Sequence, residues 1–249
     1  MIVFTIAGYE LRRLFGSPQA WIVLAVIQFL SAMFFYILLS RYLEAPQAQG
    51  ERGMTQMVAA GTLQIAGIIL LMVTPFLTMR LFSDEQRSGT IQLLFSSPVS
   101  LTDLVLGKYL GIVLFLFLAL ILIALMPLSL LPGTNLDLGL LAAGLLGLAL
   151  LVLTFAAVGL FISTLTAQPG VAAILTFAVL FLLWIVHIAG STTTGPAAEV
   201  FSYLSLLQHF NTLLQGMVNS VDVVFFLIMS SLFILLSIWR LDAVRTHHW

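Results

Sequence analysis

The sequence is distinguished first by the residue types that it lacks or contains rarely, which are cysteine and charged residues. It contains no cysteine among its 249 residues, which excludes disulfides, thiol catalysis and thiolate metal sites. Charged residues make up only 8% of it, whereas a soluble domain has about 25%. With a net charge of −1, the chain also lacks the basic surplus that binding to nucleic acid requires. Because 61% of its residues are hydrophobic, we expect the bilayer to be its solvent.

Catalytic and nucleotide-binding motifs are missing as well. The sequence has no GxSxG elbow, no HExxH pair and no Walker loop. Of its four histidines only His247 and His248 lie close together, and we assign these two to a solvated tail rather than to a metal site. We therefore expect no enzyme activity, cofactor or metal in this chain, and we expect a partner to supply any energy source.

Six long apolar segments predict an all-α polytopic membrane protein, with the chain 1–249 as one transmembrane domain. A span needs about 20 apolar residues, and its backbone hydrogen bonds must close within the segment, so helices are expected. The segments do not alternate as the strands of a membrane barrel would. None contains Asp, Glu, Lys or Arg, and they cover 21–40, 54–79, 109–131, 138–164, 171–189 and 223–239.

The basic residues predict the orientation of these spans. With both termini in the cytoplasm, the outer side holds only Arg41 and Arg52. The inner side then holds seven basic residues, which agrees with the positive-inside rule: Arg12, Arg13, Arg80, Arg87, Lys108, Arg240 and Arg245.

Two further apolar segments do not look like spans. Segment 1–18 has an apolar stripe and two basic residues away from it, which is typical of a helix lying in the membrane interface. Its stripe consists of Val3, Phe4, Ala7, Leu11, Leu14 and Phe15. Segment 199–218 repeats polar residues along one face, so we interpret it as an outer re-entrant or interfacial helix. A seventh span is the competing interpretation.

The stretch 80–108 collects acids and bases between the second and third spans. Ser83 with Gln86, and Ser100 with Asp103, have the spacing of capping boxes, which predicts two helix starts. Gly89 is placed to end the first helix. We therefore expect a short helix-turn-helix on the membrane surface rather than an ordinary solvated loop. Nearby, Gly107 and Gly111 permit close helix packing, but GxxxG occurs often by chance in glycine-rich spans.

The same stretch carries a family resemblance. Its order of residues resembles the signature of ABC-2 type permeases, the membrane subunits of one class of ATP-binding-cassette transporters. The residues that carry the resemblance are Glu85, Arg87, Gly89, Thr90, Leu93, Leu94, Ser97, Pro98, Val99, Ser100, Gly107, Lys108 and Tyr109. Within that family the chain is most similar to the compact permeases of the gliding-motility and nitrous-oxide-reductase-maturation type, on size and loop lengths.

The resemblance implies a mechanism and a location. It places the chain in a prokaryotic inner membrane, with 80–100 as a coupling-helix segment that sits in a cleft of a cytoplasmic ABC ATPase. The implied coupling residues are Ser83, Glu85, Arg87, Gly89, Thr90, Leu93, Leu94, Phe95 and Pro98. In this scheme Glu85 and Arg87 are paired charges that fix the register, and Leu93, Leu94 and Phe95 are buried knobs. The segment between spans five and six would form an outer gate, here Tyr203, Leu207, His209 and Leu214.

The partners follow from the same resemblance. Two ATPases, which bind the ATP and Mg²⁺, would join two permease copies, and we expect a homodimer. An outer protein, where one is needed, would be a separate chain. The work done would be export of a substrate or conformational signalling across the membrane. The alternative is a membrane scaffold, anchor or channel subunit that is not coupled to an ATPase.

Overall fold

The computed structural model describes residues 2–44, 53–91, 99–132, 136–192, 200–201 and 203–247. Within these ranges the chain forms helices and no strands, which confirms the predicted all-α class. Leu93, Leu94, Phe95 and Pro98 of the predicted coupling segment lie outside the described residues.

Six helices are long and apolar enough to cross a membrane, as predicted. They are α2 (Pro18–Glu44), α3 (Gly61–Thr78), α6 (Leu101–Leu128), α7 (Leu138–Ser163), α8 (Pro169–Thr192) and α11 (Ser220–His247). A π-helical turn, η1 (Thr55–Ala60), leads directly into α3. Several helices run past the predicted bounds, because the predicted segments stop at charged residues whereas the helices continue through them. Lys108 in α6 and Asp222 in α11 are the two cases that matter below.

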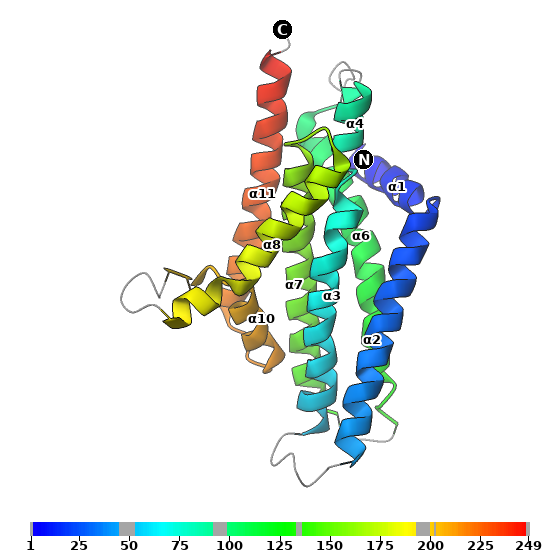
Figure 1. The fold of residues 1–249 in the computed structure, drawn as a ribbon, viewed down its shortest axis with the longest axis vertical. Coiled ribbons are helices and arrows are strands. Elements are labelled where there is room, and N and C mark those ends of the chain that lie inside the picture. The colour runs from blue at the N-terminus through cyan, green and yellow to red at the C-terminus, as the bar shows by residue number, and fades with distance from the viewer. Residues whose placement is uncertain are drawn as a thin grey trace.

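Helix α7 lies at the centre of the bundle, in contact with α3, α6, α8 and α11 (Figure 1). In its most apolar stretch 72% of the residues are buried inside the chain, against 17% for α2 and 28% for α8 and α11. The outer helices therefore present most of their apolar side chains to lipid or to another chain, as expected where lipid replaces water as solvent.

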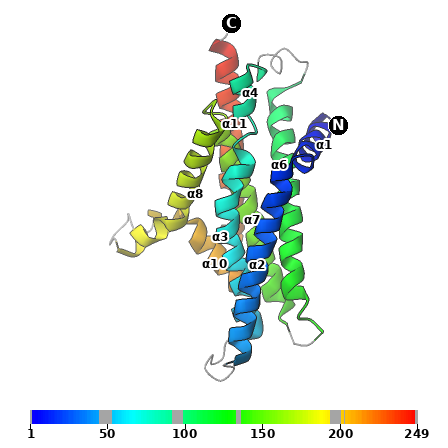
Figure 2. The same ribbon diagram turned by 45° about the vertical axis from the view of Figure 1, so that its right-hand side comes forward.

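Helix α1 (Ile2–Phe15) lies obliquely across one end of the bundle and packs on α6 (Figures 1 and 2). The contact is close because α6 presents two glycines. A Cβ at Gly107 would lie 2.6 Å from the Cβ of Ile6, and one at Gly111 would lie 2.8 Å from the Cβ of Glu10. The GxxxG pattern, which carried little weight as a sequence signal because it is common by chance, is thus the docking site of α1.

The predicted apolar stripe of α1 is only partly the buried face. Ala7 is buried, but Phe4 is 74% exposed and Glu10, which the stripe omits, is 2% exposed. The contact with α6 is centred on Ile6, Ala7 and Glu10, and this rotates the buried face away from Phe4. The polar residue Glu10 can occupy this face because its carboxylate lies beside the Arg13 guanidinium, 3.5 Å away.

Two short helices lie at different levels of the bundle. Helix α4 (Ser83–Ser88) follows α3 at the end that also holds α1 and the C-terminal part of α11, which we call the α4 end (Figure 1). Helix α10 (Leu206–Leu214) packs against α7, α8 and α11. With nine residues α10 is shorter than a span, which needs about 20, and the described residues of 199–218 contain no helix long enough to cross a membrane.

Candidate functional site

A buried lysine holds α4 against α6. Lys108 is 3% exposed, and its Nζ donates to the Leu81 carbonyl oxygen at 2.6 Å and to Glu85 Oε1 at 2.5 Å. The ammonium also lies 4.9 Å from the centre of the Phe82 ring, within the range of a cation–π contact. A buried charge is tolerated only when it is paired in this way. The carboxylate of Glu85, predicted to face a partner, is therefore engaged inside the chain.

Two polar side chains hold α4 against the turn that follows α7. Ser83 Oγ donates to the Ser163 carbonyl oxygen at 3.1 Å, and Gln86 Nε2 donates to the Thr164 carbonyl oxygen at 2.8 Å. The predicted capping box at Ser83 is therefore wrong. Phe82 occupies the cap position without a side-chain hydrogen bond, because both capping candidates satisfy carbonyl groups of another helix end instead. We call Lys108, Glu85, Ser83 and Gln86 the α4 cluster.

The exit from α4 agrees with the sequence. Gly89 takes a left-handed conformation, φ 73°, and ends the helix as predicted. Arg87, Ser88 and Thr90 are exposed at this end. The second predicted capping signal is also confirmed, since Ser100 Oγ accepts from the amide of Asp103 at 3.1 Å and begins α6. Arg87 is thus exposed beside a polar core that hydrogen bonds and one ion pair hold together, although Glu85 Oε2 accepts no hydrogen bond from the described residues.

A further polar contact joins α1 to the turn between α3 and α4. Arg13 Nη2 donates to the Arg80 carbonyl oxygen at 3.4 Å, while the same guanidinium lies beside Glu10. Helix α4 is thus connected by polar side chains to α6 and to the end of α7, and the turn that precedes it is connected to α1.

A second cluster lies at α10, where His209 is buried at 6% exposure. Its Nδ1 lies 2.5 Å from Asp222 Oδ1, and its Nε2 lies 2.9 Å from the Tyr203 carbonyl oxygen. Because a carbonyl oxygen can only accept, Nε2 carries a proton. The ring also stacks on Phe225 with centroids 4.1 Å apart. We call Tyr203, His209, Asp222 and Phe225 the α10 cluster.

The predicted gate residues do not share one environment. His209 and Leu214 are buried, Leu207 is half-buried and Tyr203 is 52% exposed. The buried side of α10 packs closely on α7, since a Cβ at Gly147 would lie 2.9 Å from the Cβ of Leu213. Among the described residues, no three His, Cys, Asp or Glu side chains are placed to hold a metal ion.

Asp222, the partner of His209, was not predicted from the sequence. The predicted sixth span began one residue later, and so the acid was left in a loop. The sequence does contain a signal for the place of Asp222. An acidic side chain is favoured in the first turn of a helix, which is where Asp222 lies in α11. Its partnership with His209, thirteen residues earlier, depends on the fold of the intervening chain.

Comparison with protein-family models identifies the family to which this chain belongs. Residues 4–244 match the family model described as "ABC-2 family transporter protein". The chain belongs to the ABC-2 transporter family. As an ABC-2 permease it is the membrane subunit of an ABC transporter, and the family in general cooperates with an ABC ATPase. A search of curated proteins finds no match.

Proposed function

We propose that this ABC-2 permease couples ATP hydrolysis by a separate cytoplasmic ATPase to export of a substrate or to conformational signalling across the membrane. The observation that supports this most is the set of links from α4 to α6 and to the end of α7. A force applied to α4 reaches both, because separating a buried hydrogen-bonded group from its partner costs about 1–3 kcal/mol each time.

The ATPase contact would be the outward surface of the α4 segment. Arg87 is an exposed charge there, and Leu93, Leu94 and Phe95, which follow it in the sequence, are the apolar knobs of the proposal, with Pro98 after them. Glu85 has a different role from Arg87 in this scheme. Its ion pair with Lys108 transmits movement into α6, while Arg87 binds the partner.

The outer gate of the proposal is α10. Its contacts with α7 are apolar, around Leu213 and Gly147, and its strongest polar link is the pair of His209 with Asp222 on α11. Apolar contacts have no preferred direction, so α10 can shift along α7 when the neighbouring spans tilt.

The working assembly we propose contains two permease copies and two ATPases, which bind ATP and Mg²⁺. The α4 end would face the cytoplasm of a prokaryotic cell, with both termini on that side. The position of α1, α4 and the C-terminal part of α11 at one end supports this arrangement (Figure 1). The basic residues of this end lie on these elements, in the turn between α3 and α4, or at the adjoining end of α6: Arg12, Arg13, Arg80, Arg87 and Lys108.

The first experiment is a mild-detergent purification of the tagged permease from its native membrane, with mass spectrometry of the eluate. We expect a stoichiometric ATPase with a Walker motif. Its reproducible absence from an intact, folded permease would favour the scaffold or channel alternative.

Variants then separate docking from transmission. Glu85→Lys is expected to keep the ATPase bound and to abolish its coupling to the permease, whereas Arg87→Glu is expected to weaken binding of the ATPase. Asp242→Lys, a charge reversal at an exposed acid of α11, is the matched control. Full coupling in Glu85→Lys would contradict the role given to the α4 cluster.

A further inference from the structure

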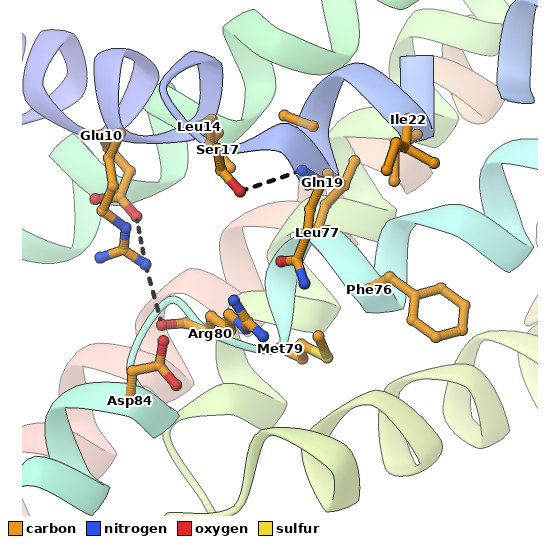
Figure 3. Close-up of a pocket in the computed structure, with 13 residues that line it drawn as sticks. Glu10, Leu14, Ser17, Gln19, Ile22, Phe76, Leu77, Met79, Arg80 and Asp84 are labelled. Carbon is orange, nitrogen blue, oxygen red and sulfur yellow. Dashed lines mark hydrogen bonds and ion pairs between the residues drawn. The ribbon is translucent and has the colours of Figure 1, made fainter. Parts of the chain in front are cut away.

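A cavity opens between α1, α2, α3 and the start of α4, and nothing in the coupling scheme uses it. Its volume is about 390 Å³, within the range of small-molecule sites. Figure 3 shows Glu10 and Asp84 toward one side of it and Ile22 and Phe76 toward the other. The cavity is therefore amphipathic, with a charged end beside α1 and α4 and an apolar end along α2 and α3.

The charged end contains groups without a full set of partners. Glu10 is 2% exposed, and its Oε1 accepts no hydrogen bond from the described residues, although the Arg13 guanidinium lies 3.5 Å away. Arg80 and Asp84 both line the cavity. Neither side chain makes a hydrogen bond or ion pair with a described residue. A buried carboxylate oxygen left unsatisfied is costly, so a donor from outside the chain is expected here.

The charges indicate what that ligand carries. Glu10 and Arg13 offset each other, which leaves the cation of Arg80 and the anion of Asp84 to be matched. A ligand with one phosphate and one primary ammonium group matches both, since guanidinium binds phosphate well and ammonium donates to carboxylate. An anionic ligand alone would leave Asp84 without a counter-charge.

The apolar end indicates that the ligand is a lipid. Ile22 and Phe76 are each 62% exposed on the outer surface of α2 and α3, where acyl chains lie in a membrane. Trp21 is next to the cavity lining, and its Nε1 donates to the Phe15 carbonyl oxygen at 2.9 Å. Tryptophan is enriched at the level of the lipid headgroups, so the charged end of the cavity lies at that level.

We propose that this cavity binds a phospholipid with an ethanolamine headgroup from the leaflet at the α4 end. The phosphate lies at Arg80, the ammonium at Asp84 and Glu10, and one acyl chain along Ile22 and Phe76. The lipid would fill the space between α1 and the start of α4, and so the two elements would move together. The site does not depend on the coupling role of α4.

Native mass spectrometry tests the site directly. The permease is reconstituted in vesicles of equal parts phosphatidylethanolamine and phosphatidylglycerol, extracted in mild detergent and analysed for retained lipid. We expect one phosphatidylethanolamine per chain. Arg80→Gln and Asp84→Asn should each lower its retention about tenfold, the effect of losing one charge-assisted hydrogen bond. Arg87→Gln, an exposed arginine of α4 outside the cavity, should retain the lipid as the unaltered chain does.

The competing outcomes are distinct. Equal retention in all variants, or preferential retention of phosphatidylglycerol, would overturn the proposal. Binding of inorganic phosphate to the delipidated permease, with no preference for phosphatidylethanolamine, would assign the site to a small anion instead. The lipid preference is measured on the unaltered chain. That measurement can therefore refute the proposal even if a variant fails to fold.

Discussion

The α4 cluster and the α10 cluster both contain a buried ion pair that joins a short helix to a span, yet they are built differently. At α4 the pair of Lys108 and Glu85 is one of several polar links, which also involve Ser83 and Gln86. At α10 the pair of His209 and Asp222 is the strongest polar link to a span, beside a long contact between Gln64 and Asn211, and the packing on α7 is apolar. Helix α4 is thus held by several short polar links, whereas α10 is held by one short polar link and by apolar packing.

The chemistry of the two cations differs as well. A lysine ammonium stays charged when it is paired, whereas the charge of a histidine depends on its second proton. The α4 cluster thus suits an element that transmits force, and the α10 cluster suits an element that changes position.

Replacement of Lys108 by methionine should have the largest effect, because it leaves the Glu85 carboxylate unpaired in a mostly buried site. We expect a loss of about 3–5 kcal/mol in the free energy of unfolding, measured by denaturant titration in detergent. The double variant Lys108→Met with Glu85→Gln should regain part of this loss, since no charge then remains unpaired. A double variant less stable than Lys108→Met would contradict the ion-pair interpretation.

Asp222→Asn should destabilise the chain less, by about 2 kcal/mol, because it removes one charge-assisted hydrogen bond while the asparagine can still accept from His209. Asp242→Asn, at an exposed acid of the same helix, is the control and should leave the unfolding free energy nearly unchanged. A loss as large as that of Lys108→Met would show that the two clusters are equally rigid.

Gln86→Ala removes the link between α4 and the Thr164 carbonyl. We expect a loss of about 1 kcal/mol in the same titration, the usual contribution of one hydrogen bond. Arg87→Ala changes the adjacent, exposed residue and should have an effect below about 0.5 kcal/mol. Equal effects of the two substitutions would mean that the link to Thr164 does not hold α4.

Gln64→Ala should have the smallest effect. Gln64 is exposed on α3, and its Nε2 lies 3.5 Å from Asn211 Oδ1 of α10, at the outer limit of a hydrogen bond. We expect a change within about 0.5 kcal/mol. A loss equal to that of Gln86→Ala would reveal a second firm link at α10 and weaken the contrast.

Much of the fold could be predicted from the sequence, because the determining signals are local. Spans are long apolar runs, and Gly89 and Ser100 act within a few residues of the helix ends that they define. The six spans and the end of the short helix α4 at Gly89 were predicted on this basis. Membership of the ABC-2 family was predicted from motif order and is confirmed by the family match.

The parts that could not be predicted depend on contacts between distant residues. Lys108 was counted as an inside charge and as a residue of the family signature, but its burial was not predicted, since its partners at Leu81 and Glu85 come from another part of the chain. Ser83 and Gln86 have a local capping pattern, but two carbonyl groups about eighty residues away compete for them successfully. The docking of α1 on Gly107 and Gly111 likewise needs both helices in place.

The most direct test uses the absence of cysteine, because two introduced cysteines are then the only sites for spin labels. Leu138 and Met217 are both more than half exposed and flank the contact of α7 with the segment after α10. With the partner ATPase bound, addition of an ATP analogue that is not hydrolysed should change the distance between labels at 138 and 217. In a Glu85→Gln background that retains the ATPase, the change should be lost. The same change in both backgrounds would contradict transmission through the α4 cluster.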